Sequence, residues 1–307
     1  MTKKNLFKRI ASVAMAGALT LSMALPVGAA TNDPNLVVEA NTLYSTPITS
    51  GSSVTLGLMP GNANYQRSGF DSAADAATSL EAKVTIGSDK VDESSIKYGS
   101  METTDYAGNA TYAGTVTVKG KDGAYGPASL HVVNKNGTGD YAYIDMTVYV
   151  EAAETKDAVD VAEVQAVDVR DTTPKVLEDK SNLSVAAARN KTANPFNGAK
   201  GSAQSYPTAG DALYSLAEAA GLSFTQNDGY VQSITTSAGT EYKAYTDVND
   251  NWTYYGWNYC VIRDDKKVTD GDILSASVLE VKKGDEVYWA YGTSGQATAY
   301  FDSLLGE

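Results

Sequence analysis

The sequence predicts two folded parts, an all-β N-terminal Ig-like sandwich and an α+β C-terminal β-grasp-like domain with one main helix. Short alternating strands separated by Gly- and Asn-rich turns fill residues 31–151, and this spacing is typical of a sandwich. Residues 161–307 instead combine one well-capped helical stretch with several strands, which favours an α+β unit. The acidic segment 152–160 holds no aromatic residue and is predicted to be a solvated linker between them.

Residues 1–30 are predicted to be a secretory signal peptide. Four basic residues come first, then an apolar run, then a small-residue end at 26–30. The apolar run of about 16 residues is shorter than the roughly 20 that span a bilayer, and it ends in a cleavable pattern. We therefore expect a secreted, extracellular chain that is not inserted in a membrane. Any association with a cell surface would then be through another protein.

The mature chain is strongly acidic. Without the four basic residues of the leader, the 24 Lys and Arg fall to 20 against 37 Asp and Glu, a formal charge of about −17. Nucleic acids and anionic membranes attract basic surfaces, so neither is an expected partner. Cys260 is the only cysteine, so stability cannot come from an internal disulfide.

The N-terminal strands are predicted at short runs of β-branched and apolar residues. These runs cover 36–38, 54–56, 84–86 and 115–118. Two longer runs, 129–133 and 141–150, flank a Gly- and Asn-rich segment and predict a hairpin. Residues 71–82, rich in Ala and Asp, fit either a helical turn or a long loop, and the sequence does not decide between them.

The C-terminal elements begin with a predicted strand at 161–169, followed by a polar segment near 170–206 that predicts a flexible insertion. A helix is predicted over 208–220, because Thr208 and Asp211 have capping-box spacing and Gly221 stands where a left-handed cap falls. Further strands are predicted at 230–236, 242–245, 257–262, 277–281 and 286–291.

All three tryptophans, Trp252, Trp257 and Trp289, lie in two aromatic segments near the C-terminus. Strand alternation places Trp257, Tyr259 and Val261 on one face, and Val287, Trp289 and Tyr291 on one face of the later strand. Large aromatic side chains usually form core, which is one interpretation. The other places part of the cluster on a rim that stacks on a flat ligand or a sugar. The candidate ligand-binding residues are Trp252, Tyr254, Tyr255 and Trp257.

Catalytic and metal-binding patterns have little support, so no enzyme activity and no metal site are predicted. His131 is the only histidine, and no Gly-x-Ser-x-Gly element occurs. Residues 247–251 alternate oxygen-bearing side chains, but Trp252 stands where a calcium loop of the EF type requires Gly. We therefore interpret this run as a solvated turn. Cys260 lies in an apolar strand and is expected to be buried and inert.

Four motifs carry a family resemblance. They are Asp-Ala-Leu-Tyr-Ser-Leu at 211–216, Tyr-Val-Gln-Ser-Ile at 230–234, Gly-Trp-Asn-Tyr-Cys-Val at 256–261, and the Gly-Asp-containing strand at 282–291. In this order they resemble the transcobalamin-like C-terminal domain family, over about 161–291. The resemblance implies a β-grasp-like, non-catalytic extracellular module, with cobalamin as the candidate ligand and no other cofactor.

Two functions follow as expectations. The first is a secreted non-catalytic ligand-binding protein whose C-terminal domain binds a corrinoid or another small flat ligand. The alternative is an extracellular glycan-binding or protein-adhesion module at the cell surface, suggested by the 20 tyrosines and by the predicted sandwich. The expected partner is thus a small molecule or a glycan.

Overall fold

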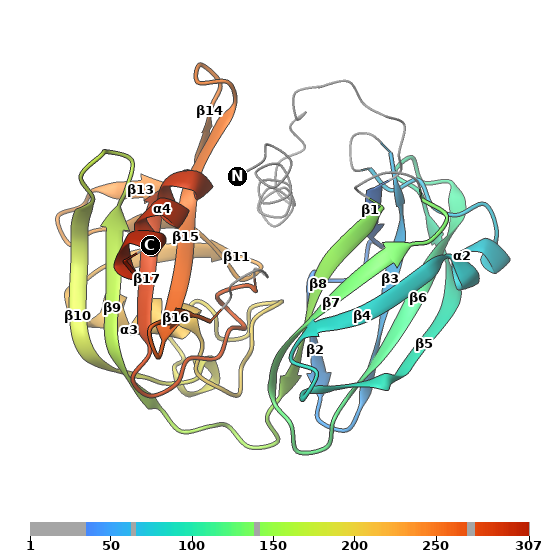
Figure 1. Cartoon of the computed structure of the whole chain (residues 1–307), viewed down its shortest axis with the longest axis horizontal. Helices are drawn as coiled ribbons and strands as arrows, with labels where there is room; N and C mark the ends of the chain where they lie inside the picture. The colour runs from blue at the N-terminus through green and yellow to red at the C-terminus, as the bar shows by residue number, and fades with distance from the viewer. Residues whose placement is uncertain (1–34, 63–65, 138–141, 269–273, 307) are drawn as a thin grey trace. The chain divides into compact units, whose positions relative to one another are not determined.

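The structure is a computed structural model that describes residues 35–62, 66–137, 142–268 and 274–306. The predicted leader at 1–30 and part of the predicted hairpin loop lie outside these residues. The chain divides between Ala153 and Glu154 into two compact units (Figure 1). The described residues are mostly β-strand and include three α-helices. None of these helices is both long and apolar enough to cross a bilayer.

The N-terminal unit contains two four-stranded sheets. The first has the order β1(Asn35–Val38), β3(Ser53–Gly61), β6(Ala110–Gly120), β5(Val91–Thr104). The second has the order β2(Ser45–Thr49), β8(Tyr143–Glu151), β7(Gly126–Asn134), β4(Leu80–Ile86). β2 and β8 are parallel, and the other pairs are antiparallel.

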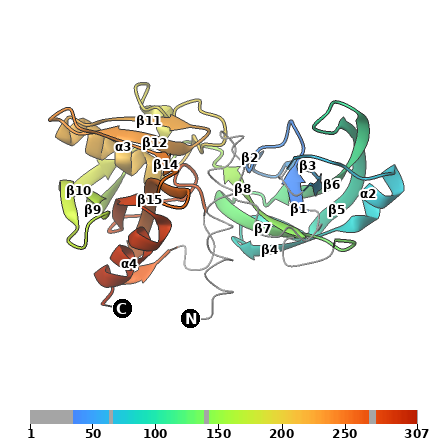
Figure 2. The ribbon, with the colours of Figure 1, turned by 90° about the horizontal axis from the view of Figure 1, so that it is seen from above.

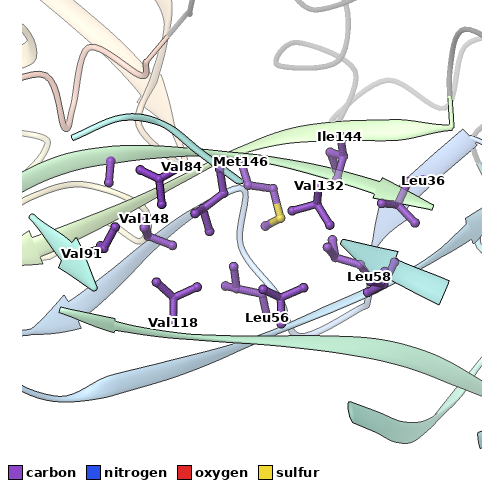
Figure 3. Packing of buried hydrophobic residues seen from close by; sticks show 14 of the residues in the cluster. Leu36, Leu56, Leu58, Val84, Val91, Val118, Val132, Ile144, Met146 and Val148 are labelled. Atoms are coloured by element: carbon purple, nitrogen blue, oxygen red, sulfur yellow. The ribbon is translucent and has the colours of Figure 1, made fainter. Parts of the chain in front are cut away.

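One apolar core holds these two sheets together. Leu56, Leu58 and Val118 point from one sheet toward Val132 and Met146 of the other (Figure 3). All of these side chains are almost completely buried, and each contributes roughly 1.5–3 kcal/mol by leaving water. The core accounts for the alternation of apolar residues along these strands.

The predicted N-terminal strands fall within β1, β3, β4, β6, β7 and β8. The undecided stretch contains a short helix, α2(Ala73–Ser79), whose N-cap Ser72 accepts a hydrogen bond from the Asp75 amide. The all-β prediction for this part is therefore incomplete. β2 and β5 were not predicted, and most residues of β5 are polar and not buried, so it lacks the apolar signal of an inner strand.

The C-terminal unit is built on a sheet with the order β10(Lys175–Val185), β9(Val159–Asp168), β17(Glu286–Gly292), β15(Thr253–Arg263), β14(Tyr245–Asp247). β9 and β17 run parallel at its centre, and β16(Lys266–Lys267) pairs with β15. A second sheet consists of β11(Ser223–Asn227), β12(Tyr230–Thr235) and β13(Glu241–Lys243). Figure 2 shows α3(Ala209–Ala220) and the second sheet on one face of the main sheet, and α4(Ser294–Leu304) on the other.

α4 corrects the prediction of one main helix. Its N-cap Thr293 forms a capping box with Gln296, and Ala297 and Phe301 pack on Cys260 and other residues of the main sheet. Cys260 is buried, as expected. The capping-box spacing and the apolar residues one turn apart were signals available in the sequence.

α3 agrees with its prediction at both ends. Thr208 Oγ1 accepts a hydrogen bond from the Asp211 amide at 3.2 Å, and Asp211 Oδ2 accepts one from the Thr208 amide at 2.9 Å. Gly221 has φ of 70° and ends the helix. Local capping chemistry therefore suffices to place this helix.

The segment near 170–206, predicted as a flexible insertion, contains β10, a 3-10 turn (Ala188–Asn190) and buried residues such as Phe196 and Tyr206. Asn194 Nδ2 donates to Asp211 Oδ1 at 2.6 Å, and the Tyr206 hydroxyl donates to the Val278 carbonyl at 3.0 Å. Gly210 of α3 lets Phe196 of this segment pack closely on the helix, because a Cβ atom there would lie 2.8 Å from Phe196 Cε2.

The strand predicted at 277–281 is also wrong. Residues 275–279 form turns, with the Val278 amide donating to the Ser275 carbonyl at 3.0 Å. The carbonyls of Ser277 and Leu279 accept from the Ala203 and Ala209 amides instead of from a strand. The apolar residues of this stretch are buried, although they belong to a turn and not to a β-ladder.

Stability of the C-terminal unit is expected to fall as pH rises from about 4 to 7, because of Asp211. Burial raises the pKa of this carboxyl to about 7, although hydrogen bonds from Thr208 and Asn194 act to lower it. The unfolded carboxyl keeps its ordinary pKa, so between the two values the folded state binds more protons. The free energy of unfolding then declines by up to about 1.4 kcal/mol per pH unit.

Urea unfolding of wild type and Asp211→Asn between pH 4.5 and 7.5, followed by tryptophan fluorescence, checks this prediction. All three tryptophans belong to the C-terminal unit, so the signal reports that unit. The variant should lack this part of the pH dependence. If the free energy of unfolding changed with pH in the same way in both proteins, the assignment to Asp211 would be contradicted.

Candidate functional site

The most exposed aromatic feature is a β-hairpin at the end of the main sheet, residues 245–256, which we name the aromatic hairpin. β17 pairs with β15 only from Gly256 to Ile262, whereas Thr253 to Tyr255 pair with β14 alone. The hairpin therefore extends beyond its neighbouring strands, as Figure 1 shows at the label β14. In the described part of the chain, the hairpin therefore has no third strand paired beside it.

Exposed apolar side chains concentrate on this hairpin. Eight large hydrophobic residues are exposed in the described part of the chain, and four of them are Tyr245, Val248, Trp252 and Tyr254. The other four are distributed over both units: Tyr98, Tyr106, Val176 and Leu304. A cluster of exposed apolar side chains marks a binding surface more often than single exposed residues do.

Trp252 lies in the turn of the hairpin and is 48% exposed. Asn251 and Trp252 have φ of 49° and 59°, and the Thr253 amide closes the turn on the Asp250 carbonyl at 2.9 Å. Turns with two positive φ values favour Asn-Gly, and a non-glycine residue costs about 1–2 kcal/mol there. Backbone geometry alone would thus favour glycine at the position of Trp252.

Tyr254 offers a flat ring to solvent. A Cβ atom added to Gly256 would lie 2.8 Å from Tyr254 Cε1 and 2.9 Å from its hydroxyl oxygen, so the ring covers the backbone of that glycine. The side chain remains 45% exposed. One side of the ring thus rests on the strand, which holds it in place and leaves area available for a ligand.

Tyr245 and Tyr255 face each other across the two strands of the hairpin. Their rings are stacked, with centroids 5.1 Å apart and an interplanar angle of 10°. The Tyr255 hydroxyl donates to Asp250 Oδ2 at 3.3 Å. The stacked pair supports the hairpin, and the exposed Tyr245 adds apolar area beside it.

Arg170 occupies the base of the hairpin. Its guanidinium carbon lies 4.8 Å from the Tyr291 ring centroid and 5.7 Å from that of Tyr242. Its Nε and Nη2 donate to the two oxygens of Asp168 at 2.9 and 2.7 Å. Burial acts to raise the pKa of Asp168, but the Arg170 hydrogen bonds and charge outweigh it and lower that pKa. The Arg170 charge is thus already paired within the protein.

The remaining tryptophans belong to the interior. Trp289 is 2% exposed, and its Nε1 has no partner among the described residues. Trp257 is half-buried, donates from Nε1 to the Tyr242 carbonyl at 2.8 Å and has its ring 5.2 Å from that of Tyr291. Trp257 lies opposite Tyr291 and Tyr259 opposite Trp289, which confirms the predicted alternation of faces.

Three of the four predicted site residues, Trp252, Tyr254 and Tyr255, therefore lie together in the hairpin, and Trp257 lies at its base. Tyr245 and Val248 were not among the predicted site residues, although Tyr245 ends the strand predicted at 242–245. Within the described residues, no group of three His, Cys, Asp or Glu side chains is placed to hold a metal.

Comparison with known proteins adds little to this geometry. No family model and no curated protein matches the sequence. Solved structures with a partial likeness include domains 4 and 5 of the S-layer protein SbsC, at 14% identity and a TM-score of 0.21, covering 38% of this chain and 46% of that one. The present chain thus spans less than half of that structure.

Two further structures have similar scores. Tandem Ig repeats of Dlar show 12% identity and a TM-score of 0.22, with 50% of this chain and 67% of that chain covered. Chitinase ChiW from Paenibacillus sp. str. FPU-7, described as a cell-surface-expressed multi-modular enzyme, shows 16% identity and a TM-score of 0.23, with 47% and 11% covered. Scores this low give no basis for transferring a function.

Proposed function

We propose that this protein is a non-catalytic extracellular binding protein whose aromatic hairpin binds carbohydrate. The observation that carries the proposal is Trp252, a large aromatic residue that is half exposed at a turn position whose backbone favours glycine. Backbone conformations of this kind occur at ligand-binding sites more often than elsewhere. Contact with a ligand gives a reason for tryptophan at this position.

Carbohydrate fits the arrangement because a sugar ring has a flat apolar face and a polar edge. The exposed rings of Trp252 and Tyr254 provide apolar area with few rotatable bonds, and Asp247 and Asp250 lie in the same turn region as hydrogen-bond acceptors. Apolar surface combined with a few polar groups is the usual composition of a ligand site. The hairpin thus favours the glycan-binding alternative over a purely structural role.

We propose further that the C-terminal unit is β-grasp-like and that the N-terminal unit is an Ig-like sandwich. The antiparallel pair of β9 and β10, the helix α3 that follows it, and the parallel placement of β17 beside β9 support a β-grasp-like C-terminal unit. Two sheets around one core support an Ig-like sandwich for the N-terminal unit. The resemblance to the transcobalamin-like family stays a prediction, and cyanocobalamin therefore belongs in the same ligand panel.

Retention of purified mature protein on insoluble cellulose, chitin and xylan, with a parallel spectral titration of cyanocobalamin, tests the proposal. We expect the wild type to be retained on at least one polysaccharide, and Trp252→Ala and Tyr254→Ala to bind at least about 10-fold more weakly, as for central aromatic contacts. Tyr106→Ala is the matched control, because Tyr106 is 64% exposed but lies in the N-terminal unit.

Circular dichroism of each variant checks that it is folded. Absence of retention of the wild type on every polysaccharide would overturn the carbohydrate proposal. Equal retention of the wild type and both hairpin variants would move the site away from the hairpin. A spectral response to cyanocobalamin alone would return the assignment to the corrinoid expected from the resemblance.

A further inference from the structure

The charges on the aromatic hairpin bear on which carbohydrates it can accept. Residues 245–256 include two carboxylates, Asp247 and Asp250, and no Lys or Arg. Asp250 is exposed and Asp247 is half-buried. An anionic sugar that stacks on Trp252 or Tyr254 would therefore approach two negative charges.

Cations close to the hairpin do not offset these carboxylates. Arg170 is exposed, but its guanidinium is held by both oxygens of Asp168 and lies over the Tyr291 ring, so the Arg170–Asp168 pair carries no net charge. Lys243 is exposed two residues before Tyr245, but Glu241, also exposed, lies on the same strand. In the described part of the chain, Arg170 and Lys243 therefore each have an acidic neighbour and add no net positive charge that would attract a uronate, sulfate or phosphate.

Hydrogen-bonding capacity points in the same direction. Asp247 Oδ1 accepts from the amides of Asn249 and Asp250 at 2.9 and 3.3 Å, and Asp250 Oδ2 accepts from the Tyr255 hydroxyl. The described residues use one oxygen of each carboxylate in these bonds, and an ionised carboxylate only accepts. A ligand that binds to the remaining carboxylate oxygens must donate hydrogen bonds, as sugar hydroxyl groups do.

We infer that the aromatic hairpin binds uncharged glycans and discriminates against acidic ones, with Asp247 and Asp250 as the specificity-determining residues. This inference rests on the proposed carbohydrate function. Each carboxylate is expected to weaken binding of an anionic glycan by about three-fold at low ionic strength, and added salt is expected to screen the effect.

Affinity gel electrophoresis with charge-matched polysaccharide pairs tests the inference. The probes are hydroxyethyl cellulose with carboxymethyl cellulose, glycol chitin with carboxymethyl chitin, and dextran with dextran sulfate. The wild type should bind the uncharged member of a pair about 10-fold more tightly, and combined Asp247→Asn and Asp250→Asn should reduce that ratio at least three-fold.

Combined Asp228→Asn and Asp265→Asn is the charge-matched control. Both residues are exposed in the same unit, away from the hairpin sequence, and both have positive φ, which asparagine tolerates. This control should leave the ratio unchanged, whereas Trp252→Ala should weaken binding to both members of a pair.

The outcomes separate the two claims. Equal or tighter binding of the acidic member, or an unchanged ratio in the Asp247 and Asp250 variant, overturns the inference and leaves carbohydrate binding intact. Absence of binding to any member of any pair overturns both the inference and the proposed function. If the ratio of binding to the uncharged and acidic members falls equally in the Asp228 and Asp265 control, discrimination depends on net charge. That outcome would overturn the role of Asp247 and Asp250.

Discussion

Replacing Asp285 with alanine is expected to lower the free energy of unfolding of the C-terminal unit by about 3–5 kcal/mol. Asp285 is completely buried. Its two oxygens accept from Arg263 Nε and Nη2, both at 2.7 Å, and from the Lys282 amide at 2.7 Å. Alanine would leave the guanidinium and the amide without their acceptor, at the turn that starts β17.

Urea unfolding followed by tryptophan fluorescence measures this loss. Glu218→Ala is the control, because the ion pair of Glu218 with Lys191 is exposed and such pairs contribute at most about 1 kcal/mol. A loss for Asp285→Ala no larger than that of the control would show that the buried pair does not stabilise the unit as inferred.

Trp252→Gly is expected to weaken glycan binding by about 10- to 100-fold and to leave the fold intact. Central aromatic contacts contribute about 1.4–2.8 kcal/mol to binding when they are removed singly. Glycine is the residue that the positive φ at this position favours, so the turn should keep its geometry without the indole. The free energy of unfolding should stay within about 1 kcal/mol of the wild-type value.

Trp252→Gly distinguishes the effect of losing the indole from the effect of distorting the turn, whereas Trp252→Ala does not. Trp252→Ala keeps a Cβ atom in the strained conformation, and a loss of binding could then reflect a distorted hairpin. Trp252→Gly with unchanged binding would show that the indole makes no contact with the ligand. A large loss of stability would show that the indole is mainly a packing residue.

Local signals in the sequence identified much of the C-terminal unit. The capping box of Thr208 and Asp211, together with Gly221, placed α3 because these interactions join neighbouring residues. Strand alternation likewise placed Trp257 with Tyr259 on one face of their strand, and Trp289 with Tyr291 on one face of theirs, because the period of a strand fixes the face of each residue. The pairing that joins the two rows appears only in the structure.

Elements that depend on distant partners were less accessible. The segment near 170–206 has the composition of a loop, but Asn194 and Tyr206 bond to Asp211 and to the Val278 carbonyl, contacts that only the tertiary fold creates. The same limit explains why residues 277–281, of which three are apolar and buried, begin in a turn and do not form a strand. β5 escaped prediction because its residues are mostly polar.

The candidate site was predicted in composition but not in geometry. The exposed positions of Trp252 and Tyr254 follow from the end of the β15 and β17 ladder at Gly256, a register that strand alternation does not specify. The positive φ of Trp252 contradicts residue preference, so no rule of turn chemistry would assign it to this residue.

Tryptophan fluorescence during titration with a soluble uncharged oligosaccharide tests the central claim most directly. Trp289 is buried and Trp257 half-buried at the base of the hairpin, so a change in the emission of an exposed indole reports on Trp252. We predict a shift to shorter wavelength on binding in the wild type, absent in Trp252→Gly. Saturable binding with the same emission change in both proteins, or no binding of any uncharged glycan by the wild type, would contradict the assignment of the aromatic hairpin as the carbohydrate site.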